Sequence, residues 1–342
     1  MADTTTEQEP RAANGGVQAS AILKTGAHRN VADSVYTSVT FAASLSIFLI
    51  IICIAWNLTT ASGESIKHFG FRYVSSPTWD ETQDQYGILP FIFGTLYSSV
   101  IALILAVPVS IGAAIFLSEL APAWIRTPAT FLIELLAAIP SVVYGLWGIF
   151  VLIPFLRDHF MKPVSGSFLA RTPGIKALFS GDPIGPSMLA AGVILAIMII
   201  PFITAVTRDI LHAIPRSQRE GSYALGATQW ETISRVVAPY ARSGIVGAVI
   251  LGLGRAFGET MAVTMVIGNG TPPTPTGTSW SLFEPGNTMA SALANKFTEA
   301  GPGLNQSALM EVGLVLFAVA ICVNIVARLL VTYTAKDLKG AG

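Results

Sequence analysis

Two charged residues lie inside a markedly apolar stretch of the chain. Arg255 and Glu259 are four positions apart in the segment Gly252-Leu-Gly-Arg-Ala-Phe-Gly-Glu-Thr-Met-Ala-Val263. On a continuous helix this spacing places both side chains on one face, so we expect an ion pair between them. A central arginine costs about 2.5–3.5 kcal/mol on membrane-insertion scales, and apolar residues would avoid that cost. The pair therefore indicates a function, with a purely structural ion pair as the alternative.

An anion would account for the arginine. A guanidinium group supplies the positive charge that an anion needs in hydrocarbon, and its geometry matches that of phosphate. We predict that Arg255 meets a transported anion or sets a gate, and that Glu259 holds Arg255 in place when the anion is absent. Thr260, the next residue, is assigned to the same pathway.

The segment 208–240 carries a second set of signals. Ser217-Gln-Arg-Glu220 and Thr228-Gln-Trp-Glu231 both fit the capping-box pattern. They predict a helix over Gln218–Leu225 with Gly226 just beyond its end, and a second helix that runs to about Val237 and stops at Pro239. Two short helices around a glycine turn, with Trp230 offering an apolar contact, form a plausible docking piece. An amphipathic loop on the lipid surface and a DNA-binding helix-turn-helix are the alternatives.

Signals for catalysis or cofactor binding are missing from the sequence. No Gly-x-x-x-x-Gly-Lys-Ser/Thr motif occurs, and the four histidines are scattered without metal-ligand spacing. We therefore expect no enzyme activity and no cofactor bound by this chain. If ATP drives transport, its hydrolysis must take place in another polypeptide.

The composition shows what kind of protein must hold Arg255, Glu259 and the segment 208–240 in place. The 342 residues are 52% hydrophobic and 12% charged, with a mean hydropathy of +0.62 and a formal net charge of zero. Soluble domains carry about 25% charged residues, so an integral membrane protein is expected. The absence of a bulk positive charge argues against nucleic-acid binding.

Six stretches are long and apolar enough to span a bilayer. They are Val39–Leu58, Leu89–Leu117, Thr130–Phe155, Met188–Val206, Gly244–Gly268 and Val312–Val331. We expect an all-α membrane domain over residues 37–335, a polar N-terminal tail over residues 1–36 and a short C-terminal tail over residues 336–342. The side that holds both termini carries most of the Lys and Arg residues, which predicts that both termini are cytoplasmic.

The docking segment resembles a known motif. Glu220-Gly-Ser, Gly226 and the ending Val236-Val-Ala-Pro239 are similar to the EAA motif of ABC importer permeases, with departures at Gly221, Ser222, Val236 and Ala238. In that family the two helices couple the membrane subunit to an ATPase. The resemblance thus implies an ATPase-coupling role for Ser217, Glu220, Gly226, Ala227, Thr228, Trp230 and Pro239.

Other stretches narrow the resemblance to the phosphate-specific permease subunits of this family. These are the span-five segment continued to Asn269, Glu134–Gly145, Ser281–Thr288, Glu311–Phe317 and Asn324–Arg328. The resemblance covers residues 35–335 and implies a type I ABC importer permease (MetI-like) fold in the bacterial inner membrane. Implied partners are a PstA-like second permease, an ATPase dimer that uses ATP and Mg, and an extracytoplasmic phosphate-binding protein. The outer loop 269–305 contains a predicted short helix over Asn287–Phe297, with Asn287 as a candidate cap. The resemblance implies that this loop docks the binding protein, and a lid that closes the bundle is the alternative.

Other functions remain open at this point. A permease for sulfate or molybdate would share the same architecture. An ion-coupled secondary transporter would show an inverted repeat, and none is obvious in the sequence. A membrane-anchored DNA-binding sensor is a further alternative, although both flanks of the candidate segment lead directly into apolar spans.

Overall fold

The computed structural model describes residues 31–167, 172, 175–271 and 277–339. These residues belong to two compact units that divide between Trp56 and Asn57. The first unit consists of most of helix α2 (Val31–Ala61), which begins inside the stretch that we expected to be a tail. Residues 1–30 of that tail, residues 272–276 of the outer loop and the last three residues of the C-terminal tail lie outside the described residues.

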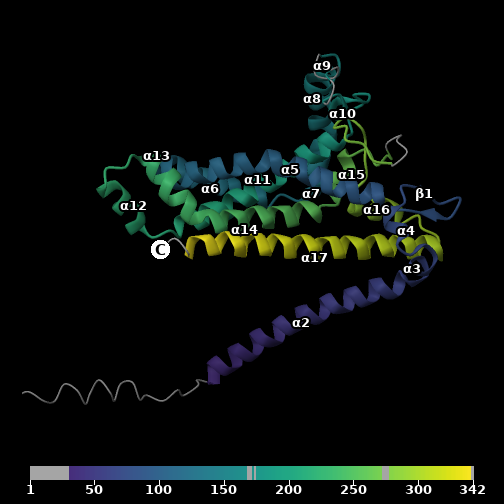
Figure 1. Ribbon diagram of the computed structural model, residues 1–342, viewed down its shortest axis with the longest axis horizontal. Coiled ribbons are helices and arrows are strands. Elements are labelled where there is room, and N and C mark those ends of the chain that lie inside the picture. Colours follow the sequence, from purple (N-terminus) through teal and green to yellow (C-terminus); the bar gives the residue numbers. More distant parts are fainter. Residues whose placement is uncertain (1–30, 168–171, 173–174, 272–276, 340–342) are drawn as a thin grey trace, which may run out of the picture. The chain divides into compact units, whose positions relative to one another are not determined.

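Four long helices run side by side in the second unit (Figure 1). They are α5 (Leu89–Ile115), α11 (Met188–His212), α14 (Ala238–Phe257) and α17 (Leu304–Lys339). Helix α11 packs against both α5 and α14, and α14 packs against α17. Two thirds of the apolar window of α11 is buried, so this helix is the centre of the bundle.

The shorter elements gather at the two ends of these helices (Figure 1). One end, called here the α12 end, carries the π-helical turn η1 (Phe116–Leu120), α12 (Arg216–Ala224), α13 (Gln229–Thr232) and the π-helical turn η5 (Ile233–Val237). The other end, called the α16 end, carries α3 (Gly63–Phe69), α4 (Arg72–Ser75), α15 (Met261–Val266), α16 (Met289–Lys296) and an antiparallel pair of strands, β1 (Trp79–Asp80) and β2 (Gln85–Tyr86).

A broken helix lies beside the bundle. Helix α6 (Ala123–Ala137) ends before Pro140, and the chain continues as α7 (Ser141–Trp147). The segments that follow are η2 (Gly148–Leu152), α8 (Ile153–Leu156), η3 (Arg157–Met161), α9 (Lys162–Ser165) and α10 (Lys176–Phe179).

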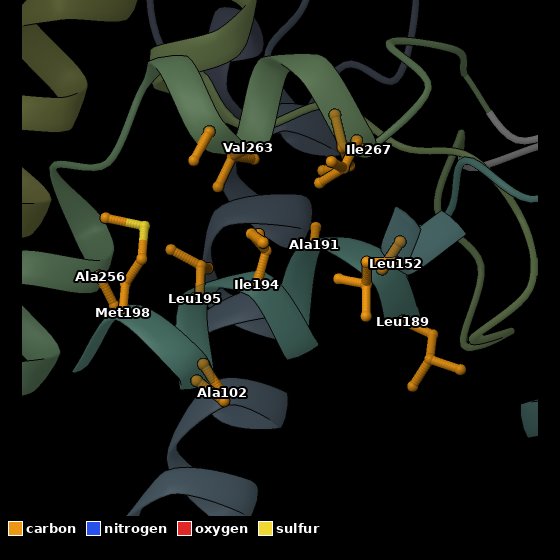
Figure 2. Packing of buried hydrophobic residues seen from close by; sticks show 14 of the residues in the cluster. Ala102, Leu152, Leu189, Ala191, Ile194, Leu195, Met198, Ala256, Val263 and Ile267 are labelled. Carbon is orange, nitrogen blue, oxygen red and sulfur yellow. The ribbon is translucent and has the colours of Figure 1, made fainter. Parts of the chain in front are cut away.

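The largest buried cluster joins α11 to α15. Figure 2 shows Val263 and Ile267 pointing toward Ile194, Leu195 and Met198 of α11. All five side chains are almost completely buried. Since lipid tails are as apolar as these side chains, van der Waals packing rather than escape from water holds the helices together.

Six helices of the described chain are long and apolar enough to cross a membrane. They are Asp33–Ala61, Leu89–Leu120, Ser141–Ser165, Met188–His212, Gln229–Phe257 and Leu304–Thr332, and their number confirms the prediction of six spans.

Several of the predicted boundaries are wrong. The third span ends at Ser165 rather than Phe155, the fifth begins at Gln229 rather than Gly244, and the sixth begins at Leu304 rather than Val312. The third span starts at Ser141 rather than Thr130, because Pro140 disfavours a helical conformation of the residue before it. The fifth span ends at Phe257 rather than Gly268, and a non-helical break separates it from α15.

Candidate functional site

The break between α14 and α15 changes the environment of the charged pair. Helix α14 stops at Phe257, so Arg255 lies in its last turn while Glu259 and Thr260 follow in the break. Glu259 Oε1 accepts a hydrogen bond from the backbone N–H of Ala262 at 3.1 Å. The expected ion pair is therefore not formed, because the two residues no longer share one helix face.

Arg255 is exposed and makes no ion pair within the described part of the chain. Its guanidinium carbon lies 5.9 Å from the centre of the Phe202 ring, close enough for a cation–π contact. Glu259 and Thr260 are half-buried, and Thr260 Oγ1 donates to the carbonyl of Gly258 at 3.3 Å. The site therefore presents a free guanidinium group beside an interrupted helix.

Helices α7 and α15 both follow an interruption, and they pack against each other. A Cβ atom added to Gly145 would lie 2.5 Å from Met265 Sδ and 3.2 Å from the Cα atom of Ala262, so a larger residue would require the Met265 side chain and the backbone of α15 to shift. Non-helical backbone at membrane depth is tolerated where protein buries it or where it lines a water-filled cavity. The close packing of α7 against α15 thus buries part of the backbone beside the two interruptions.

The first helix of the docking segment differs in detail from the prediction. Helix α12 begins at Arg216 with Pro215 as its N-cap, so the expected capping box of Ser217 and Glu220 does not form. The extended backbone of Pro215 (ψ 136°) sets the start of the helix one residue before Ser217. Ser217 and Glu220 are both exposed, and Glu220 has no ion pair among the described residues.

The turn after α12 agrees with the prediction. Gly226 follows the C-cap residue and has a φ of +84°, a conformation that L side chains rarely adopt. Its N–H donates to Tyr223 O at 2.9 Å, and the N–H of Ala227 donates to Ser222 O at 3.2 Å, which is the Schellman pattern. The predicted helix-ending position of Gly226 is confirmed.

The second capping box is also confirmed. Thr228 Oγ1 accepts from the N–H of Glu231 at 3.3 Å, and Glu231 Oε2 accepts from the N–H of Thr228 at 2.9 Å. Pro239, however, does not stop the helix. It lies in the first turn of α14, directly after η5, where a proline needs no N–H donor.

The docking segment exposes large apolar side chains at the α12 end. Leu225 is 91% exposed and Trp230 is 68% exposed. The residues predicted to couple to an ATPase thus lie together at one end of α14, whereas Arg255 lies at the other end. The 20 residues of α14 separate the two groups by about 30 Å.

Sequence reasoning missed one strong contact in this region. Arg219 of α12 forms a two-point ion pair with Glu119 of η1, with Nη2–Oε1 and Nε–Oε2 distances of 2.7 and 3.1 Å. The hydrogen bond to Glu119 raises the pKa of Arg219 above its ordinary value, although burial of the guanidinium group opposes this. The position of Glu119 at the end of an apolar span suggests from the sequence that its carboxylate needs a partner. The sequence does not show which of several arginines forms the ion pair.

The outer helix α16 starts one residue later than predicted. Its N-cap is Thr288 rather than Asn287, and Thr288 forms a capping box with Ser291. The backbone N–H of Met289 donates to Thr95 Oγ1 of α5 at 3.0 Å, which fixes the helix to the bundle. Within the described residues, no group of three or more His, Cys, Asp or Glu residues could hold a metal ion.

A largely helical bundle with six candidate spans, interrupted helices and a projecting pair of short helices at one end is the architecture of a multi-span membrane protein. Residues 106–340 match the family described as "Binding-protein-dependent transport system inner membrane component", and the chain belongs to this family.

Relatives within this family are similar over nearly the whole chain. The chain is 48% identical over 300 residues to the phosphate transport system permease protein PstC of Haemophilus influenzae, covering 88% of this chain and 93% of the relative. It is 44% identical to the protein of the same name from Pasteurella multocida, covering 90% and 94%.

Solved structures confirm the fold. The chain resembles a subunit of a bacterial ABC transporter involved in the import of alginate, with a TM-score of 0.56, 15% identity, and 90% and 99% of the two chains covered. It also resembles a chain of the MetNI methionine ABC transporter, with a TM-score of 0.50, 17% identity, and 75% and 99% covered. The MetI-like permease fold predicted from the sequence is therefore correct.

Proposed function

We propose that this chain is the transmembrane permease subunit of an ATP-driven importer of inorganic phosphate. The observation that carries the proposal is the identity of 48% to a phosphate transport permease over about nine tenths of both proteins. The exposed Arg255 at the helix break supports it, because a transported anion requires a compensating positive charge inside the membrane.

In this proposal the α12 end faces the cytoplasm, as the distribution of Lys and Arg predicts. An ATPase dimer would hold the exposed Leu225 and Trp230 together with Glu220, while a PstA-like permease completes the pathway. An extracytoplasmic phosphate-binding protein would deliver phosphate to the α16 end. ATP and Mg would be bound by the ATPase and not by this chain.

The mechanism needs two conformations of similar free energy, each favoured by a different state of the partners. Closure of the ATPase dimer would move α12 and α13, and α14 would follow because η5 joins α13 to it without a gap. Phosphate would then pass the guanidinium group of Arg255. Glu259, whose carboxylate caps α15 instead of pairing with Arg255, would keep the far side of the break in place.

The test is phosphate uptake by proteoliposomes that contain this chain with its presumed second permease, ATPase and binding protein. Radiolabelled phosphate is supplied with and without ATP, and with excess unlabelled sulfate as competitor. We expect uptake that requires ATP and is insensitive to sulfate. Uptake of sulfate or molybdate instead would keep the architecture and overturn the substrate, and uptake driven by an ion gradient without ATP would overturn the coupling role of α12 and α13.

A further inference from the structure

The ion pair between Arg219 and Glu119 connects the docking segment to η1 at the end of α5. These two elements are far apart in the sequence and are not joined by a continuous helix. We propose that Arg219 is a positioning residue that transmits movement of α12 to α5. This inference rests on the proposed function, and it assigns a role to two residues that lie outside the EAA-like motif.

The guanidinium group of Arg219 is held at four points. Nη2 and Nε donate to the two carboxylate oxygens of Glu119, while Nη2 and Nη1 also donate to the carbonyls of Leu211 and Ile214 at 2.8 and 2.9 Å. The two side chains are only 17% and 10% exposed. A planar guanidinium bound in this way has a fixed orientation, in contrast to a solvent-exposed ion pair.

The second helix of the docking segment, α13, also forms a hydrogen bond with Glu119. Gln229 Nε2 of α13 donates to the main-chain carbonyl of Glu119 at 3.1 Å. The hydroxyl groups of Ser222 and Thr232 lie 2.9 Å apart and join α12 to α13. The two short helices therefore form one piece that is anchored to the side chain and the backbone of a single residue in η1.

The connections of this piece to the bundle differ in kind. Helix α14 continues from α13 through η5, and α11 is joined to α12 by the three residues 213–215. Residues 121–215 lie between η1, at the end of α5, and α12. Contacts made by side chains, and not a short connecting loop, therefore join α12 to the end of α5. Arg219 contacts both η1 and the end of α11. Its loss would remove the side-chain link between α12 and η1 and leave the hydrogen bond from Gln229, so less of the movement of α12 would reach α5.

Arg216 provides a matched control. It lies three residues before Arg219 on α12, is exposed, and has no ion pair or hydrogen bond from its side chain among the described residues. Replacing it removes the same charge from the same helix without touching Glu119.

The experiment uses the complete transport complex in proteoliposomes with Arg219→Gln, Glu119→Gln, the double variant and Arg216→Gln. Three quantities are measured: the ATPase that co-purifies, the ATP hydrolysed, and the phosphate taken up per ATP. We expect each single variant at the ion pair to retain the ATPase but to lose about tenfold in phosphate per ATP, and the double variant to lose no more than the worse single variant. Arg216→Gln should match the wild type.

Several outcomes would overturn the proposal. Undiminished phosphate per ATP in Arg219→Gln would show that the ion pair transmits nothing, whereas loss of the ATPase in step with transport would make Arg219 a docking residue. Losses that multiply in the double variant would show that the two residues act independently. A wild-type complex without ATP-driven phosphate uptake would contradict the proposed function itself, so the two failures are distinguished by the wild-type arm.

Discussion

The guanidinium group of Arg255 is available for a ligand because its helix ends two residues later. Had α14 continued, Glu259 would lie one turn away and neutralise it. The carboxylate of Glu259 instead binds the N–H of Ala262. The break therefore leaves the guanidinium group without a carboxylate partner, two residues from the end of its candidate span. The proposed anion pathway uses that free positive charge.

Replacement of Arg255 tests this directly. We expect Arg255→Ala to reduce phosphate uptake at least about a hundredfold while the complex still assembles, because a buried anion would lose its compensating charge. Arg255→Lys should retain part of the activity, since the charge remains but the planar fork is lost. Uptake and co-purification of the partner subunits are measured in parallel, and normal uptake by an assembled Arg255→Ala complex would contradict the role.

Gly226 is the residue whose backbone conformation the docking segment most requires. Gly226→Ala should cost about 1–2 kcal/mol locally, because a Cβ atom is disfavoured at a φ of +84°. The space around it is open, so the cost comes from the backbone rather than from a clash. We expect weaker binding of the ATPase with unchanged membrane insertion.

Gly221 is the matched control for that prediction. It lies on α12 with equally open surroundings but without a positive φ. Gly221→Ala should therefore leave ATPase binding intact, since alanine favours a helix. Equal ATPase affinities for the two alanine variants would show that the conformation of the turn does not matter for docking.

At the scale of elements, the contact between α5 and the loop before α16 depends on one close approach. A Cβ atom at Gly94 would lie 1.9 Å from the main-chain oxygen of Asn287. Backbone cannot move aside as a flexible side chain can, so Gly94→Ala should lower the free energy of unfolding by about 1–3 kcal/mol. The purified complex in detergent should show a clear fall in its melting temperature.

Gly112 of the same helix supplies the comparison, because no atom lies within 4 Å of its Cβ position. Gly112→Ala should be neutral or stabilising by up to about 1 kcal/mol. Equal melting temperatures for the Gly94→Ala and Gly112→Ala variants would mean that α5 and the loop before α16 are not in the close contact described above.

Much of the element structure was accessible from the sequence, for physical reasons that are easy to identify. Long apolar runs predict spans from composition alone, and the Thr228 capping box and Gly226 depend only on local hydrogen bonds and φ. The break after Phe257 was missed because it depends on how α15 packs against α7 and α11. Likewise, both Asn287 and Thr288 suit an N-cap, and tertiary contacts select the second.

At the scale of the whole molecule, the fold and its family follow from composition and from the resemblance of extended segments. The partner of a charged side chain was much harder to predict. Glu119 and Arg219 are 100 residues apart, and nothing in the sequence around either residue indicates that the two form an ion pair. The orientation of the bundle in the membrane still stands as a prediction from charge.

That orientation is open to a labelling test. In a background where Cys53 and Cys322 are replaced by serine, Gln218→Cys marks the α12 end and Phe71→Cys, at a residue 85% exposed, marks the other end. A membrane-impermeant thiol reagent should label the first cysteine only in inside-out vesicles and the second only in right-side-out vesicles. The reverse pattern would place the α12 end outside the cell and contradict coupling to a cytoplasmic ATPase.

The break at residues 258–260 has a consequence for how motion would be divided within the chain. On one side, α13, η5 and α14 form a continuous rod of 29 residues, about 43 Å long, with Arg255 near its tip. On the other side, α15 is locked against α7 and α11, and Glu259 caps it. A tilt of the rod by a few degrees would thus carry Arg255 several ångströms past a stationary Glu259. The distance between the Arg255 guanidinium group and the Glu259 carboxylate would then report the stage of the transport cycle. It would be longest when the guanidinium group is free and shortest when the two groups form an ion pair.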